Sequence, residues 1–302
     1  MPSSSSSAPS PLAIMQEVSQ QACPSATLYV VATPIGNVGD ITLRALNVLS
    51  MADAIACEDT RNTAHLLSRY GLSKELIAAH EHNEREVAGK IIDRLQAGQR
   101  IAMVSDAGTP AVSDPGARIV DAVRTAGLRV VPLPGASASI AALSASGIVN
   151  DRFLFAGFLP AKKMQRETAL HELASVQATL VFYEAPHRII ETVDALANVL
   201  EPSRRIVIAR ELTKLFEEIH RCTLAEAGAW LSGNANRQKG EFVILVEGAT
   251  APDDEQDAES DRILEILLAE CPLKQAASLT AQITGRKKNA LYERALQLKG
   301  KG

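Results

Sequence analysis

The chain of 302 residues predicts an α/β protein with two αβα lobes, a ligand cleft between them and a small helical unit at its C-terminus. Three observations lead to this fold class. Short apolar runs alternate with helical spacing, loops of small residues directly follow three of those runs, and the composition changes sharply after Val246. A chain of this length can bury more than one apolar core.

The first lobe is expected over residues 27–135. Apolar runs predict strands at 28–32, 54–57, 101–104 and 130–133, and amphipathic spacing predicts helices at 42–50, 60–70, 84–97 and 117–126. Strands that alternate with helices of this length are typical of a parallel sheet covered on both faces.

The second lobe is expected over residues 136–249. Strands are predicted at 153–158, 179–183, 205–209, 218–223 and 242–246, and helices at 137–145, 162–174 and 189–200. The last two strands lie close together along the chain, so part of this sheet should be antiparallel.

The two ends of the chain differ from the lobes. Residues 1–26 are rich in Ser, Ala, Pro and Gln and predict a disordered tail, within which Met15 is an alternative start to Met1. Residues 250–261 predict an acidic linker, because 251–262 hold six acidic residues and one Arg.

Residues 262–302 predict a helical unit of helix-turn-helix type, with helices at 263–269, 273–283 and 289–298. From 272 to 302 there are seven Lys or Arg against one Glu, and Arg286, Lys287 and Lys288 open the last helix, where phosphates can meet free backbone amides. RNA contact is one interpretation of this unit. The other is a bundle that only packs on the protein or on a second copy.

Composition limits the function further. The net charge of −4 argues against a generally basic nucleic-acid-binding surface, although local patches can still bind RNA. The four cysteines are widely spaced, which fits free thiols in a reducing cytoplasm. Neither a secretory signal nor an apolar run long enough to cross a membrane is expected.

The three loops of small residues predict one ligand cradle. They cover 33–40 (TPIGNVGD), 105–116 (SDAGTPAVSDPG) and 134–138 (PGASA), and each follows a predicted strand. In an open α/β sheet, ligands bind at the carboxyl ends of strands, where small residues let the backbone approach closely.

Several common chemistries lack their motifs. No GxGxxG dinucleotide fingerprint, GxxxxGK[ST] phosphate loop or GxSxG nucleophile elbow is present. His80 and His82, with Glu81 and Glu84, could form a metal pair, but no third ligand motif accompanies them. A hydrogen-bonded surface turn is the favoured interpretation, and no metal is expected.

An ordered set of motifs resembles the tetrapyrrole methylase superfamily, and within it the branch that methylates ribosomal RNA. The motifs are LYVVATPIGNVGDITLRA, CEDTR, HEHNE, VSDAGTPAVSDPG, PLPGASA, FLPAKK, FYEAPHRI, RELTK and GEFV. The resemblance covers about 27–248 and extends to the C-terminal helices. It implies S-adenosylmethionine as methyl donor, a homodimer, and 2′-O-methylation of a cytidine ribose in the decoding region of 16S rRNA.

The resemblance also implies cofactor-binding residues. They are Val38 in the first loop, Ser105, Asp106 and Thr109 in the second, Ser137 and Ala138 in the third, and Leu212. Leu212 and the start of the strand at Gly240, Glu241 and Phe242 should cover the adenine. Relatives that make tetrapyrroles often carry Met where this chain has Glu184, a departure that fits the RNA branch better.

A ribose hydroxyl is a poor nucleophile, so a general base should help to remove its proton. The candidates are Glu58, Asp59 and Glu184, with Arg61 placed to hold a phosphate or to pair with Glu58. The structural alternatives are a helix N-cap at Asp59 or Thr60, and an ion pair of Glu184 with Arg188.

Lys162, Lys163 and Arg166 could clamp RNA phosphate or merely form a solvated helix face. Two other functions stay open at this point. One is C-methylation of tetrapyrroles, which has no need of a basic C-terminal unit. The other is a non-catalytic RNA-binding assembly factor, which would not bind the methyl donor.

Overall fold

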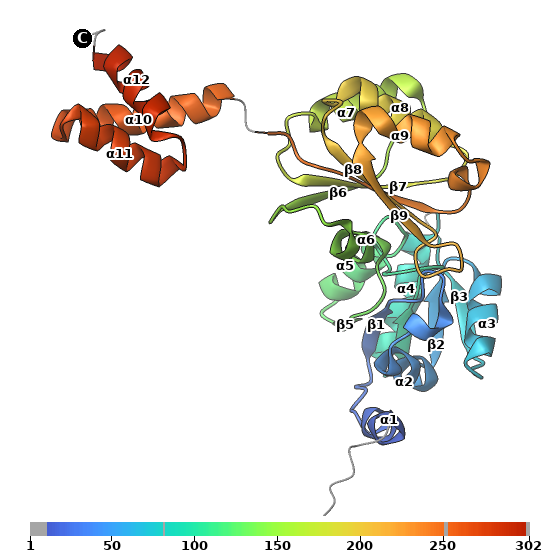
Figure 1. Cartoon of the computed structure of the whole chain (residues 1–302). Coiled ribbons are helices and arrows are strands. Elements are labelled where there is room, and N and C mark those ends of the chain that lie inside the picture. The colour runs from blue at the N-terminus through green and yellow to red at the C-terminus, as the bar shows by residue number, and fades with distance from the viewer. Residues whose placement is uncertain (1–10, 81, 251–252, 300–302) are drawn as a thin grey trace, which may run out of the picture.

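The computed structural model describes residues 11–80, 82–250 and 253–299. Two α/β lobes lie one above the other, and the C-terminal helices form a separate unit beside the second lobe (Figure 1). The predicted fold class is confirmed. The two lobes and the helical unit each have their own apolar cores.

The first lobe is a five-stranded parallel sheet in the order β3-β2-β4-β1-β5. The strands are β1 (Thr27–Val31), β2 (Ala54–Cys57), β3 (Glu75–Ala78), β4 (Arg100–Met103) and β5 (Arg129–Leu133), and the helices are α2 (Leu43–Met51), α3 (Thr60–Arg69), α4 (Glu84–Gln96) and α5 (Ala117–Thr125). Apolar clusters cover both faces of the sheet. Since β1 lies between β4 and β5, the loops after these three strands are neighbours.

Strand β3 was not expected from the sequence. Its four residues, ELIA, are exposed or half-buried, and it pairs with β2 alone at the edge of the sheet. An edge strand needs no continuous buried apolar run, so hydrophobic patterning gives little sign of it.

The second lobe is a mixed sheet in the order β6-β7-β10-β8-β9. Its strands are β6 (Phe153–Phe158), β7 (Thr179–Glu184), β8 (Arg205–Arg210), β9 (Glu218–Thr223) and β10 (Phe242–Val246). Only β6 and β7 pair in parallel; β10 runs antiparallel to β7 and β8, and β9 antiparallel to β8. The expected antiparallel part of the sheet is therefore confirmed.

Helices cover the two faces of this sheet unequally. Helices α7 (Lys163–Leu173), α8 (Ile189–Val199) and α9 (Leu224–Ser232) pack on the outer face. Helix α6 (Ala138–Ser146) packs on the inner face and lies between the sheet and the first lobe (Figure 1). Helix α9 was missed, although Thr223 and Glu226 form a capping box at its start that was visible in the sequence.

Two segments expected to lack structure contain helices. Within the predicted disordered tail, residues 1–10 lie outside the described residues, and 11–19 form α1 (Pro11–Ser19). Asn47 on α2 donates to the Val18 carbonyl at 3.0 Å and holds α1 against the first lobe. Within the predicted acidic linker, 251–252 lie outside the described residues, and 253–261 belong to α10 (Asp253–Glu270).

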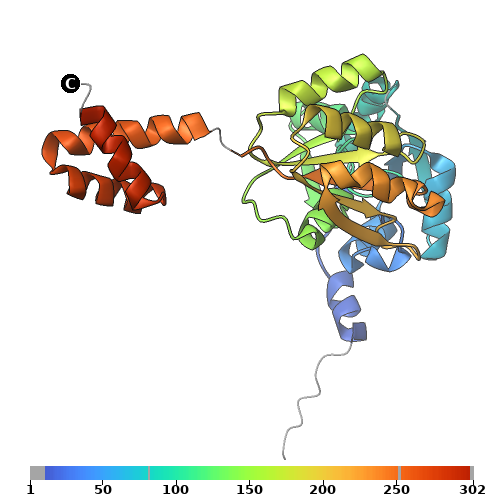
Figure 2. The same ribbon diagram turned by 45° about the horizontal axis from the view of Figure 1, so that its top comes forward.

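The C-terminal unit holds three helices, as expected: α10, α11 (Leu273–Thr284) and α12 (Lys288–Lys299). Leu264, Ala277, Leu291 and Ala295 form its core. Gly285 takes a φ of +73° and ends α11, which allows the chain to turn into α12. The view in Figure 2 again places this unit to one side of the lobes. None of the helices in the described residues is long and apolar enough to cross a membrane.

Candidate active site

Hydrogen bonds join the three small-residue loops into one continuous surface. The backbones of Thr33 and Gly108 exchange two hydrogen bonds, 2.8 and 3.0 Å long, which tie the first loop to the second. The Thr109 hydroxyl donates to the Ala136 carbonyl at 3.0 Å and ties the second loop to the third. The carboxyl ends of β4, β1 and β5 thus form one wall of a site.

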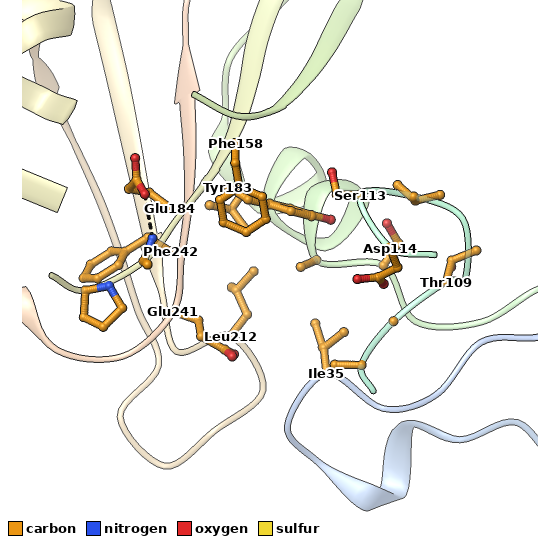
Figure 3. A pocket seen from close by; sticks show the side chains of 18 residues that line it. Ile35, Thr109, Ser113, Asp114, Phe158, Tyr183, Glu184, Leu212, Glu241 and Phe242 are labelled. Atoms are coloured by element: carbon orange, nitrogen blue, oxygen red, sulfur yellow. Dashed lines mark hydrogen bonds between the residues drawn. The ribbon is translucent and has the colours of Figure 1, made fainter. Parts of the chain in front are cut away.

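A cavity of about 360 Å³ lies between this wall and the second lobe. This volume is within the range of about 300–1,000 Å³ that is usual for small-molecule sites. Figure 3 shows Ile35, Thr109 and Asp114 on the first-lobe side and Tyr183, Leu212 and Phe242 on the other. The remaining lining residues are Ala107, Gly108, Val112, Ser113, Ser137, Ala138, Phe158, Glu184, Ala185, Pro186, Glu241 and Val243.

The loop between β8 and β9 reaches from the second lobe onto the first. The Asn37 backbone amide donates to the Thr213 hydroxyl at 3.1 Å. A Cβ on Gly36 would lie 2.6 Å from Lys214 Cγ, so any larger residue there would have to displace the Lys214 side chain. Lys214 Nζ in turn binds Glu211 at 2.9 Å and Glu241 at 2.8 Å, which fixes the loop beside the cavity.

Unusual backbone conformations gather at this site. Ala111, Ser113, Glu211 and Thr213 have φ values of +65°, +62°, +51° and +66°, a region that residues with side chains rarely adopt. The first two lie in the second loop and the others flank Leu212. Such conformations cost about 1–3 kcal/mol each and are concentrated at functional sites.

The structure brings five of the predicted site residues to the cavity. Thr109, Ser137, Ala138 and Leu212 line it, and so does Glu184. Glu241 and Phe242, which were expected near the adenine, also line it.

Val38, Ser105 and Asp106 do not line the cavity. The Val38 carbonyl accepts a 2.7 Å hydrogen bond from the Tyr70 hydroxyl. The Ser105 hydroxyl is turned back to the carbonyls of Ala107 and Gly108. The Asp106 carboxylate accepts from the Asp59 amide at 3.3 Å and the Asn62 side chain at 2.8 Å, so it holds α3 against the second loop. These three residues therefore hold the loops in place through hydrogen bonds, without lining the cavity themselves.

The acidic loop after β2 also lies outside the cavity lining. Asp59 caps α3 by accepting from the backbone amides of Arg61 and Asn62, as the structural alternative predicted. A hydrogen bond from the Arg61 side chain, followed by those from the backbone amides, lowers the pKa of Asp59 to about 2. Arg61 pairs with Asp59 at 3.0 Å, not with Glu58, and its side chain is 89% exposed. Burial, followed by the charge of Asp106, raises the pKa of Glu58.

Glu184 lines the cavity, but its carboxylate is turned away from it (Figure 3). The side chain is fully buried and points away from the cavity in Figure 3. It accepts from the Ala185 amide at 2.8 Å and from the Thr192 hydroxyl at 2.5 Å, and it lies 3.3 Å from Arg188. The structure therefore contains the Glu184–Arg188 pair that the structural alternative predicted.

Asp114 also lines the cavity, although no motif in the sequence pointed to it as a site residue. Burial raises its pKa to about 6, with smaller contributions from the charges of Glu58 and Asp106, while a hydrogen bond from Ser105 lowers it. The only sign in the sequence is its place in the loop after β4, before Pro115 and Gly116. In the described residues no group of three or more His, Cys, Asp and Glu is arranged to hold a metal ion.

The remaining candidates are the His80 turn and the basic residues Lys162, Lys163 and Arg166. Asn83 caps the backbone amide of His80 at 2.8 Å, which is the expected surface turn. Lys162 and Lys163 are exposed, and Lys163 Nζ lies 3.9 Å from the Glu167 carboxylate, so both can still be reached by a phosphate. Arg166 is not: its side chain is 3% exposed and pairs with Glu191 at 3.1 Å, so the proposed phosphate contact is wrong for this residue.

Comparisons with known proteins agree with this architecture. Residues 27–228 match the family model of the tetrapyrrole (corrin/porphyrin) methylases, and 254–299 match the RsmI C-terminal HTH domain. Two solved structures share the fold of the lobes, each covering 74% of this chain and 94% of its own. The methyltransferase CobJ has a TM-score of 0.56 at 22% identity, and uroporphyrin-III-C-methyltransferase from Thermus thermophilus has 0.53 at 19%. Fold and site thus define a protein of the tetrapyrrole methylase class.

Much closer relatives narrow this class. Proteins named ribosomal RNA small subunit methyltransferase I are 51% identical in Pseudomonas aeruginosa, over 91% of this chain and 98% of theirs, and 50% identical in Escherichia coli O157:H7, over 90% and 96%. The one from Mesorhizobium japonicum is 52% identical over 90% of this chain and 92% of its own. The chain belongs to the ribosomal RNA small subunit methyltransferase I family, which confirms the resemblance read from its motifs.

Proposed function

We propose that the protein transfers a methyl group from S-adenosylmethionine to the ribose 2′-hydroxyl of a cytidine in the decoding region of 16S rRNA. The observation that carries this proposal is a ligand-sized cavity on the strand-end loops of a chain about half identical to ribosomal RNA methyltransferases. The tetrapyrrole enzymes are far more distant, at 19–22% identity, so they support the fold alone.

The cavity suits a nucleoside with a short polar tail. Ile35, Leu212 and Phe242 offer apolar surface for a base, and the small side chains of Ser137 and Ala138 leave room at the start of α6. A Cβ on Gly135 would lie 2.6 Å from Ala32 Cβ, so the third loop can pack this closely only with glycine there. When bound, S-adenosylmethionine supplies a methyl group on a positively charged sulfur.

Exposed basic side chains can position RNA. Exposed basic residues stand at the starts of three helices: Arg61 in α3, Lys162 and Lys163 at α7, and Lys287 and Lys288 at α12. Phosphate contacts of this kind fix the position of a nucleic acid, whereas the choice of nucleotide needs contacts to its base or its shape. A substrate in the small ribosomal subunit supports a cytoplasmic location, which is part of the proposal.

A homodimer is part of the proposal. Phe153 and Leu154 on the edge strand β6 are 50% and 38% exposed, and Ile140 on α6 is 51% exposed. Unpaired strand edges and exposed apolar side chains of this kind are usual at subunit interfaces. Sedimentation that finds only monomer at micromolar concentration would contradict this part.

The function can be tested with the purified protein, small ribosomal subunits from a strain lacking the gene, and radiolabelled S-adenosylmethionine, followed by mass mapping of methylated nucleotides. We expect one methyl group on one cytidine ribose. Ala138→Leu should fill the cavity and abolish both cofactor binding and transfer. Ala145→Leu is the matched control, because Ala145 is exposed on the same helix.

The same assay separates the alternatives. Transfer to a tetrapyrrole but not to RNA would favour the C-methyltransferase. RNA binding without any binding of S-adenosylmethionine by calorimetry would favour an assembly factor.

A further inference from the structure

We propose that the Asp114 carboxylate is the general base that takes the proton from the attacking ribose hydroxyl. This inference rests on the proposed function and assigns a residue to its chemical step. It is carried by the position of Asp114 in the cavity wall, by the engagement of the other acids, and by the loop that fixes it.

Asp114 is placed where a base must be. It lies on the first-lobe wall of the cavity, facing Tyr183 and Phe242 on the other lobe (Figure 3). A hydroxyl that attacks a methyl group in this cavity would pass close to this wall. Glu58 and Asp59, the acids favoured by the sequence, are absent from the lining.

The other acids around the cavity are engaged elsewhere. Glu184 is fully buried and held by Thr192, Ala185 and Arg188. Glu241 binds Lys214 Nζ at 2.8 Å. In the part of the chain that the structure describes, no basic side chain lies within 4.0 Å of the Asp114 carboxylate.

The loop around Asp114 is held rigidly. Ser113 has a φ of +62°, a conformation that persists only when neighbouring contacts enforce it. The Gly116 backbone amide donates to the Glu84 carboxylate at 2.6 Å, and Glu84 is itself only 5% exposed. The Ala111 amide donates to the Pro115 carbonyl at 3.3 Å and closes the turn. A fixed carboxylate spares the reorganisation that a mobile one would need.

The surroundings of Asp114 also make it a stronger base than an ordinary aspartate. Burial raises its pKa to about 6, and the neighbouring charges of Glu58 and Asp106 act in the same direction, against one hydrogen bond from Ser105. Its carboxylate is therefore mainly ionised at neutral pH and still holds a proton better than a solvated aspartate does. A base with a pKa near the working pH is the most effective.

The step balances in atoms and charge. The 2′-hydroxyl oxygen forms a bond to the methyl carbon as its O–H bond breaks, and the proton moves to an Asp114 carboxylate oxygen. The electron pair of the breaking carbon–sulfur bond stays on sulfur, which becomes a neutral thioether. One carboxylate and one sulfonium are thereby neutralised together, and Asp114 then returns its proton to water.

The test compares Asp114→Asn with Asp121→Asn, an exposed aspartate on the following helix α5. For Asp114→Asn we expect kcat to fall about 10²- to 10⁴-fold, the usual contribution of a general base. Calorimetry should find the affinity for S-adenosylmethionine unchanged, and the Asp121→Asn control should leave both quantities unchanged. The kcat/KM of the wild type should rise with pH around a midpoint of about 6, and Asp114→Asn should lack this limb.

A readout without turnover completes the test. In protein labelled with ¹³C at aspartate carboxyls, one resonance should titrate near pH 6 and be missing from Asp114→Asn. If the wild type methylates RNA and Asp114→Asn does so equally fast, the inference is wrong while the function stands. Loss of cofactor affinity in Asp114→Asn would instead make Asp114 a cofactor ligand. If the wild type methylates no RNA, the proposed function itself fails.

Discussion

Replacing Asp114 by Asn should stabilise the folded protein at pH 8 and leave its stability unchanged at pH 3.5. The folded structure raises the pKa of Asp114 from 3.8 to about 6, so the folded state binds a proton more tightly than the unfolded chain. Stability from such a group is fully present below the unfolded pKa and is lost as pH rises through the folded pKa. Asn carries no charge and avoids that loss.

The size of the effect follows from the shift. At 1.36 kcal/mol per pKa unit, a rise from 3.8 to about 6 sets an upper limit of about 3 kcal/mol. The side chain is only half-buried, so solvent screening reduces the expected gain to about 1 kcal/mol. For lobes of this size, that corresponds to an increase in Tm of about 2–4 °C.

Thermal unfolding of Asp114→Asn and wild type, measured side by side from pH 3.5 to 8, gives the assay. The difference in Tm should be near zero at the acidic end, grow between pH 4 and about 6, and then stay constant. The exposed Asp121→Asn control should show no such growth. A difference that is the same at every pH would mean that burial of the charge is not its cause, and a Tm lowered at pH 8 would contradict the predicted stabilisation.

Three further predictions concern other parts of the chain. Gly135→Ala should destabilise the protein by about 1–3 kcal/mol and weaken cofactor binding, because its Cβ would lie 2.6 Å from Ala32 Cβ. Gly89→Ala is the control, since a Cβ there has no neighbour within 4 Å, and it should be neutral or stabilising. Denaturation measures the stability of both variants, and calorimetry measures their cofactor affinity. Glu184→Ala should lower stability by about 3–5 kcal/mol, because it leaves Arg188 without its buried partner, and a near-normal Tm relative to the exposed control Glu172→Ala would contradict this. The double change Lys287→Ala and Lys288→Ala should reduce the slope of log RNA affinity against log salt concentration by about 0.7–0.9 per lost phosphate contact, and should leave cofactor affinity unchanged. If filter binding over a series of salt concentrations gives an unaltered slope, the helical unit does not contact RNA through these lysines.

The sequence predicts most of the fold because the core strands are continuous apolar runs. β2, β4 and β10 are almost wholly buried, and hydrophobic patterning places them within about a residue. Hydrophobic patterning does not reveal β3, because an edge strand has no continuous buried apolar run. Residues 11–19 were expected to lack helix because they were grouped with the Ser- and Pro-rich tail, and residues 253–261 because of their acidic composition; neither pattern reveals the contact of α1 with α2 or the helix over Asp253–Glu270.

The site was likewise predicted in part from the sequence. Thr109, Ser137, Ala138 and Leu212 could be placed from motifs, because each follows a strand or flanks one. Which acid faces the cavity could not be predicted. That outcome depends on the left-handed conformation of Ser113 and on long-range hydrogen bonds, such as Glu84 to Gly116 and Asp106 to Asn62, that local sequence does not encode.

The crossing of the β8–β9 loop onto the first lobe has a mechanical consequence. The two lobes have separate hydrophobic cores, but Ile35 in the first loop packs against the core of the second lobe, and the Asn37 amide donates to Thr213 across the same boundary. A ligand that touches both walls therefore adds further contacts between lobes that already meet at this loop. Amide hydrogen exchange around Asn37 and Thr213 should slow when a ligand fills the cavity. The relative position of the two lobes would then be more rigid when the enzyme binds RNA with the methyl donor in place than without it.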